Sequence, residues 1–295
     1  MKGFGNKDRT NKKSTGKKVK SIQVDKLITN ALSLHSNGKV KEASEIYNIL
    51  IKNKFYDPRV LNNLGTIYSQ IKQFDKAILL FDESIKKFPN SMEAYSNLAN
   101  ILVTKGKINT AKKILKKAIE LNPNHLKPYS NLAGLYVGEG DFKNAEVLLR
   151  KNVDINPKDI NTLVNLACVL KDLGNPKEAE KFLRNALEIN PTYEIALTNL
   201  GAVLNELEKF DEGEQYLRKA LTINSSSPMA LNNLGNILSN KKNNSEAEFC
   251  YRKAIEIKSD FYLAYSNLAS LLSKQGKLIE AEKLTEKAIN LNPKF

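Results

Sequence analysis

Large apolar residues along this chain are spaced as on one side of an α-helix. In the segment 160–193 they are Leu163, Leu166 and Leu170, three and four places apart. Residues at this spacing share one face of a helix. Gly174 follows and predicts a turn, and an Asn-Pro pair directly after it predicts the start of a second helix. The segment is therefore predicted to be two helices joined by a tight turn.

The same pattern returns along the chain with a constant 34-residue period, without an insertion or deletion. It is marked by leucines at position 7 of successive copies: Leu64, Leu98, Leu132, Leu166, Leu200, Leu234 and Leu268. A degenerate first copy has Asn30 and Ala31 at the corresponding place. A fixed period of this length is typical of a repeat architecture. We predict eight units, at residues 24–57, 58–91, 92–125, 126–159, 160–193, 194–227, 228–261 and 262–295.

Small residues occupy two positions of the unit. Position 8 is Gly or Ala in all eight copies, and position 20 is Ala in seven, with Gly213 as the exception. Small side chains at these points let two helix backbones approach closely. One helix pair cannot bury its apolar face alone, so stacked pairs are expected to share a continuous core. The predicted fold is all-α, an α-solenoid of helix-turn-helix units.

The 34-residue period, the small residues at positions 8 and 20 and a proline at position 32 of five units together resemble the tetratricopeptide repeat (TPR) family over residues 24–295. The resemblance implies a right-handed superhelix. It also implies a concave groove lined by the first helix of each unit, through positions 2, 5, 6, 9, 12 and 13.

Those six positions are rich in amides and nearly neutral. In the second to eighth units they hold 42 residues, of which 14 are Asn, four are basic and three are acidic. Nucleic-acid affinity comes mainly from Lys and Arg that face phosphates, with stacking aromatics for single strands. We therefore expect a protein or peptide partner in the groove rather than a nucleic acid.

An asparagine stands at position 6 of all seven full units, and these are the candidate peptide-binding residues: Asn63, Asn97, Asn131, Asn165, Asn199, Asn233 and Asn267. A primary amide is both a donor and an acceptor. It can pair with the N–H and the C=O of an extended peptide whatever its side chains, so one amide per unit predicts a ladder along the groove. The alternative is that this asparagine belongs to the packing of the repeats themselves.

The ladder and the segments SNLAN (96–100) and NNLGN (232–236) are similar to the TPR half of protein O-GlcNAc transferases. In that family the corresponding asparagines contact the main chain of the substrate peptide. The resemblance covers these asparagines only, and the sequence contains no glycosyltransferase domain. It implies an alternative role as the substrate-recognition subunit or fragment of a TPR-linked transferase.

Half of the net charge lies in a short N-terminal segment. The chain has 46 basic and 32 acidic residues, a net charge of +14, and residues 1–23 hold eight basic side chains against Asp8. Such a segment has no apolar face to bury, which predicts a basic, disordered tail. The tail is either a solvated arm or a weak binding site for a nucleic acid or an anionic surface.

Residues suited to catalysis or metal binding are few and isolated. Cys168 and Cys250 stand in different units, far apart in the chain, and His35 and His125 are the only histidines. This spacing excludes a CxxC zinc site and leaves little for a Ser–His–Asp triad. We predict no enzymatic activity, no catalytic residue, no metal and no cofactor.

Neither a membrane span nor a secretory signal is indicated. No apolar run reaches the length of a transmembrane helix, and the N-terminus lacks an apolar stretch. A cytoplasmic location is therefore expected.

The last unit ends at Phe295 without a polar capping helix, which solenoids normally need. Either its own polar residues suffice, or a partner, a further segment or a second copy of the chain in a homodimer covers it. The leading hypothesis is a scaffold that binds extended segments of partner proteins in an Asn-rich groove.

Overall fold

A computed structural model describes residues 23–293 of the chain, and this part is helical without a strand. It falls into two compact units, unit 1 (Met1–Leu135) and unit 2 (Tyr136–Phe295), with the boundary inside one helix. The predicted tail, apart from its last residue, lies outside the described residues. No helix of the described part is both long enough and apolar enough to cross a bilayer.

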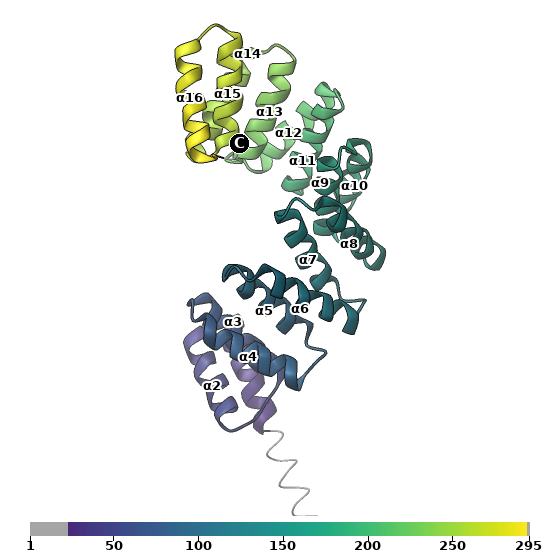
Figure 1. The fold of residues 1–295 in the computed structure, drawn as a ribbon, viewed down its shortest axis with the longest axis vertical. Helices are drawn as coiled ribbons and strands as arrows, with labels where there is room; N and C mark the ends of the chain where they lie inside the picture. The colour runs from purple at the N-terminus through teal and green to yellow at the C-terminus, as the bar shows by residue number, and fades with distance from the viewer. Residues whose placement is uncertain (1–22, 294–295) are drawn as a thin grey trace, which may run out of the picture. The chain divides into compact units, whose positions relative to one another are not determined.

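Unit 1 begins with a helical segment over residues 23–36. It continues with α2 (Val40–Lys52), α3 (Pro58–Gln70), α4 (Phe74–Lys87), α5 (Met92–Thr104), α6 (Ile108–Leu121) and most of α7 (Leu126–Gly138) (Figure 1). Here α3 packs against α4, and α5 against α6.

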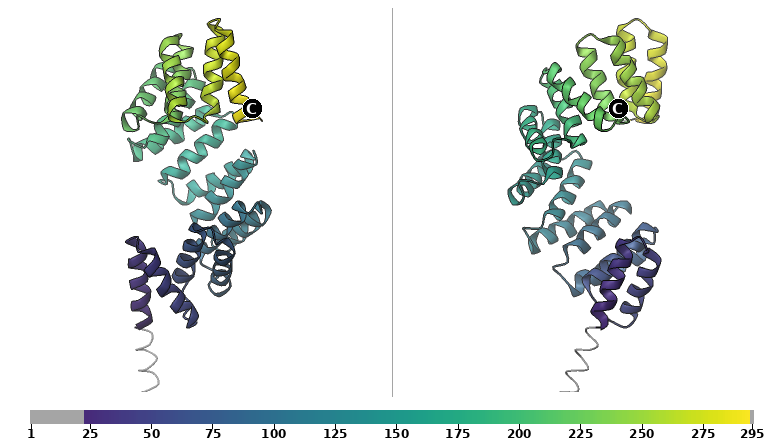
Figure 2. Two further views of the ribbon diagram at one scale, coloured as in Figure 1. Left: turned by 90° about the vertical axis from the view of Figure 1, so that its left-hand side faces the viewer. Right: turned by 180° about the vertical axis from the view of Figure 1, so that it is seen from behind.

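Unit 2 takes the end of α7 and then contains α8 (Phe142–Ile155), α9 (Ile160–Asp172), α10 (Pro176–Ile189), α11 (Glu194–Glu206), α12 (Phe210–Ile223), α13 (Pro228–Asn240), α14 (Asn244–Ile257), α15 (Tyr262–Lys274) and α16 (Leu278–Leu291). Consecutive helices lie side by side in pairs, as α15 and α16 do in both views of Figure 2. Each odd-numbered helix from α3 onward begins at the first residue of a predicted unit. The predicted all-α solenoid of helix pairs is confirmed.

Local sequence explains where several first helices begin. At the start of α3 the Asp57 carboxylate accepts a backbone hydrogen bond and Pro58 follows, and Ser227 caps α13 in the same way. Both arrangements satisfy an N–H that the helix itself leaves unpaired. The second helix α10 starts at Pro176 as predicted, but the Asn175 side chain makes no capping hydrogen bond.

The turn inside each pair places its residue at position 15 in the left-handed conformation. Five units have a glycine there, with φ of 74–79°. The other three have Lys72, Glu208 and Lys242, with φ of 59–62°. A residue other than glycine pays about 1–2 kcal/mol for this conformation. The packing of the two helices therefore imposes the turn even where the sequence lacks a glycine.

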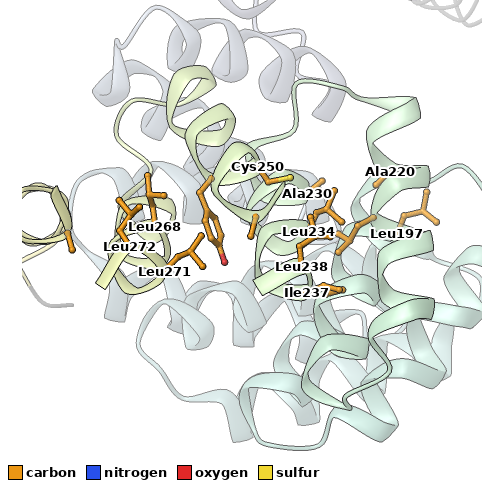
Figure 3. Packing of buried hydrophobic residues seen from close by; sticks show 14 residues of the cluster. Leu197, Ala220, Ala230, Leu234, Ile237, Leu238, Cys250, Leu268, Leu271 and Leu272 are labelled. Carbon is orange, nitrogen blue, oxygen red and sulfur yellow. The ribbon is translucent and has the colours of Figure 1, made fainter. Parts of the chain in front are cut away.

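Small residues bring the two helices of a pair together, and large apolar residues join successive pairs. Ala167 at position 8 and Ala179 at position 20 are completely buried. In unit 2 one cluster of buried side chains runs from α11 to α16 and includes Leu197, Leu234 and Leu268 (Figure 3). Three consecutive pairs thus share one continuous core, as a stacked array requires.

Arginines at position 25 form ion pairs that link successive second helices of unit 2. Arg150 on α8 bonds Glu146 on its own helix and Glu178 on α10, both at 2.8 Å. The equivalent residues Arg184, Arg218 and Arg252 repeat this arrangement with oxygens at 2.6–2.8 Å. Each exposed pair adds at most about 1 kcal/mol. These ion pairs neutralise the four arginines. Unit 2 as a whole is close to neutral, with 21 basic and 22 acidic residues.

Candidate functional site

The first helices of unit 2 present one shared surface to solvent. Helix α11 packs against α9 and α13, and α13 packs against α15. On each of the four, the side chains at positions 2, 6, 9 and 13 are exposed or half-buried. These positions are one turn apart along one side of a helix. We call this surface the A-helix face of unit 2.

Position 5 was expected to line the groove, but the structure buries it in five of the seven full repeats. Thr198 is 4% exposed and Asn232 is 3% exposed, since position 5 points between neighbouring helices rather than outward. Asn62 in unit 1 is also buried, and its amide donates to the Ser91 hydroxyl at 2.8 Å. Asparagines at position 5 are therefore packing residues, and the exposed surface contains fewer amides than the sequence predicted.

In the four repeats whose first helices belong to compact unit 2, the asparagines at position 6 lie on the A-helix face. Asn165 is exposed, and Asn199 and Asn233 are half-buried. The side-chain amides of these three make no hydrogen bond within the described residues. Asn267 differs, because its Nδ2 donates to Oδ1 of Asn232 at 2.9 Å and joins α15 to α13.

In the repeats of compact unit 1, the asparagines at position 6 are half-buried, and two of the three contact a neighbouring side chain. Asn63 lies against Tyr47, where burial raises the pKa of the hydroxyl and the Asn63 contact lowers it in part. Asn97 donates to the Thr66 hydroxyl at 3.4 Å. The Nδ2 of Asn131 is enclosed and has no hydrogen-bond partner. The structure therefore leaves open amides mainly in unit 2.

A row of apolar side chains that was not predicted from the sequence runs beside the amides of unit 2. Ile195 is 48% exposed and Met229 is 44% exposed, and Leu263 is half-buried. All three stand at position 2, one helical turn before the asparagine at position 6. The signal was present in the sequence, since position 2 changes from charged residues in the second to fourth units to apolar ones in the last three.

Charged side chains on this face gather at its other edge, at positions 12 and 13. Nζ of Lys171 lies 3.2 Å from Asp172 and 4.0 Å from Glu206. Burial raises the pKa of Glu206, and Lys171 opposes that rise while Asp172 adds to it. Between this edge and the apolar row, the faces of α11, α13 and α15 carry no charge.

Unit 1 has a hollow of its own, of about 630 Å³, at the N-terminal ends of α3 and α5. It is lined by Pro58, Arg59, Asn62, Asn63, Phe88, Pro89, Asn90, Ser91 and Glu93. Its two charged residues are those at position 2 of the second and third units, so unit 1 offers a charged rim where unit 2 offers an apolar row.

The two thiols are shielded rather than activated. Cys168 on α9 is half-buried, and burial raises the pKa of its thiol. Cys250 on α14 is buried, which raises its pKa to about 11. Over residues 23–293, no three His, Cys, Asp or Glu side chains are grouped so as to hold a metal ion.

We expect both thiols to react with iodoacetamide more slowly in the folded protein than free cysteine does, because the thiolate is the reactive form. At pH 8 the raised pKa of Cys250 alone should slow it on the order of a hundredfold. Raising the pH toward that pKa should speed it. Mass spectrometry of the alkylated peptides measures both rates, with the unfolded chain as control. A Cys168 rate equal to that of free cysteine would contradict the prediction.

Models of known families match most of the chain. Models described as the tetratricopeptide repeat match residues 102–167, 160–193, 192–260 and 250–283. A model of the N-terminal TPR repeats region of Psidin matches residues 10–129.

A curated relative, the BBSome complex member BBS4 of Bos taurus, is 36% identical over 94 residues. That match covers 32% of this chain and 18% of the relative, so the chain spans less than a fifth of the relative's length.

Solved structures show the same architecture. YrrB, described as a TPR protein with an unusual peptide-binding site, aligns with a TM-score of 0.52 and 25% identity, over 66% of this chain and 97% of its own. A chain of the APC/C hetero-tetramer Cut9–Hcn1 aligns with a TM-score of 0.66 and 14% identity, over 91% of this chain and 53% of its own. Pseudomonas aeruginosa pilF aligns with a TM-score of 0.56 and 21% identity, over 69% and 93%. Together with the helix pairs, the tetratricopeptide repeat models that match within residues 102–283 show that the chain belongs to the tetratricopeptide repeat family.

Proposed function

We propose that the chain is a non-enzymatic scaffold for protein–protein interaction, and that the A-helix face of unit 2 binds an extended segment of a partner. The observation that carries the proposal is the set of Asn165, Asn199 and Asn233. These amides stand at one position of three successive units, reach solvent and make no hydrogen bond within the described chain. Such amides are free to bind a ligand.

An extended peptide has the complementary groups. Its backbone N–H and C=O are not paired with each other, so each can bond to one side-chain amide. One such bond contributes about 0.5–1.5 kcal/mol net. Three amides in a row can therefore supply a useful part of the affinity without selecting the ligand's side chains. The similarity to YrrB, whose description names a peptide-binding site, supports a peptide as the ligand.

The alternative roles expected from the sequence stay predictions. A transferase acting together with this chain would be recovered with it on purification from its own cells. Binding of nucleic acid through the tail depends on residues 1–23, all but the last of which lie outside the described part, and would be lost on their deletion.

The proposal is tested by selecting ligands from a phage-displayed library of random peptides with the full chain. The affinity of the selected peptides is then measured by calorimetry for the wild type and for the triple variant Asn165→Ala, Asn199→Ala and Asn233→Ala. We expect the affinity to fall on the order of a hundredfold, the equivalent of about 3 kcal/mol for the lost hydrogen bonds.

The matched control replaces asparagines that are exposed on the second helices of the same unit, Asn185→Ala and Asn244→Ala. This variant should bind like the wild type, and circular dichroism should show both variants folded. An unchanged affinity in the triple variant, or no selected peptide at all, would refute the proposal.

A further inference from the structure

We propose that the A-helix face of unit 2 recognises a segment in the polyproline II conformation that carries an apolar side chain at every third residue. This inference rests on the proposed function and adds the chemistry of the partner to it. It follows from the apolar row of Ile195, Met229 and Leu263 and from the spacing of the helices that carry it.

The apolar row is built as a set of equivalent contacts. Its members are at the same position of α11, α13 and α15, and each lies one turn from the amide at position 6 of its own helix. Ile195 and Met229 leave almost half of their surface in water, which is unfavourable unless a ligand covers it. The three apolar contacts, with the open amides of Asn199 and Asn233 beside the first two of them, define a continuous strip along α11, α13 and α15.

The spacing of this strip selects the ligand conformation. Helices packed against one another, as these are, lie about 8–10 Å apart. A polyproline II segment rises about 3.1 Å per residue with three residues per turn, so every third side chain returns to the same side after about 9.3 Å. In a β-strand, same-side neighbours are about 6.6–6.8 Å apart, and residues three apart point to opposite faces. The polyproline II repeat fits the helix spacing, and the strand repeat does not.

The hydrogen-bonding groups of the ligand backbone also favour the polyproline II conformation. A polyproline II segment leaves all of its backbone N–H and C=O groups without internal bonds. The open amides of Asn199 and Asn233 lie on the two helices that carry Ile195 and Met229. A helical ligand would already have paired its backbone groups, so these amides would bind nothing on it.

Charge restricts the ligand further. The strip between the apolar row and the charged edge has no ionised side chain on α11, α13 or α15. A charged ligand side chain over this strip would lose water without finding a counter-ion. The segment is therefore uncharged over the three units it spans.

The inference is tested with uncharged synthetic peptides of about twelve residues and identical composition, in which the apolar residues stand at every third, every second or scrambled positions. Calorimetry with the full chain should show the every-third peptide binding at least about tenfold more tightly than the others. Met229→Ser should lower the affinity for the every-third peptide about tenfold. The control Phe249→Ser, at an apolar residue of α14 that is 62% exposed, should leave it unchanged.

The outcomes separate this inference from the proposed function. If the three peptides bind equally and Met229→Ser has no effect, while the triple asparagine variant weakens all of them, the inference is wrong and the proposed function stands. Tighter binding of a helical peptide with apolar residues seven apart would also overturn the inference. If no peptide binds and the library yields none, both proposals are wrong.

Discussion

Leu234→Ala is expected to lower the free energy of unfolding by about 2–5 kcal/mol. Leu234 is 2% exposed at position 7 of α13, inside the cluster that runs from α11 to α16 (Figure 3). Removing its side chain leaves a cavity between helix pairs whose backbones are already held close together. In a stacked array this weakens both its own pair and the interfaces to its neighbours.

Urea titration followed by circular dichroism measures the effect. The control is Leu278→Ala, the same change at a residue of α16 that is 64% exposed, which should shift stability by no more than about 0.5 kcal/mol. If the effect of Leu234→Ala is as small as that of the control, the side chain is not part of a continuous core from α11 to α16.

The helix pairs could be predicted because their determinants are local. Leu163, Leu166 and Leu170 lie within one helix, and the spacing alone places them on one face. Because the pattern repeats every 34 residues, the same helix pair can be assigned to every repeat. The units with Ser225 or Ser259 in place of the late proline end their helices at the same relative point, Ile223 and Ile257. The repeat geometry determines the end of the helix, and proline only reinforces it.

Whether each asparagine at position 6 has a hydrogen-bonded or an open amide could not be predicted, because the partner lies in a neighbouring repeat. Asn233 and Asn267 occupy the same position and have similar surroundings in the sequence. Asn267 bonds to Asn232, whereas the residue equivalent to Asn232 in the preceding unit is Thr198, and the Asn233 side chain makes no such bond. An amide satisfies its donor equally well with a neighbour or with a ligand. The three-dimensional placement of residues in successive units decides between the two.

Gly235 is expected to tolerate no side chain while Tyr251 is present. A Cβ on Gly235 would lie 2.6 Å from Cε1 and 2.8 Å from Cδ1 of the Tyr251 ring. The ring is 2% exposed and its hydroxyl donates to Oδ1 of Asn236 at 2.8 Å, so it cannot move aside easily. Overpacking of this kind costs about 1–3 kcal/mol, and Gly235→Val should fall at the upper end. Gly235→Ala should cost less, since alanine gains up to about 1 kcal/mol in helix propensity.

The other units show that a leucine at position 24 does not by itself make room for a Cβ at position 8. In the third to fifth units alanine at position 8 stands with leucine at position 24, as in Ala167 and Leu183. In the first unit, however, Ala31 stands with Tyr47, and in the sixth a Cβ on Gly201 would lie 2.4 Å from Cγ of Leu217. Gly235→Ala combined with Tyr251→Ala, which removes every ring atom that the new Cβ would meet, should therefore be more stable than the sum of the single changes predicts, with a coupling of about 0.5–3 kcal/mol. Gly134→Ala is the control, because its Cβ would meet no atom within 4 Å and should be neutral or stabilising. Additive effects in the urea-denaturation cycle would show that the glycine is not required by the tyrosine ring.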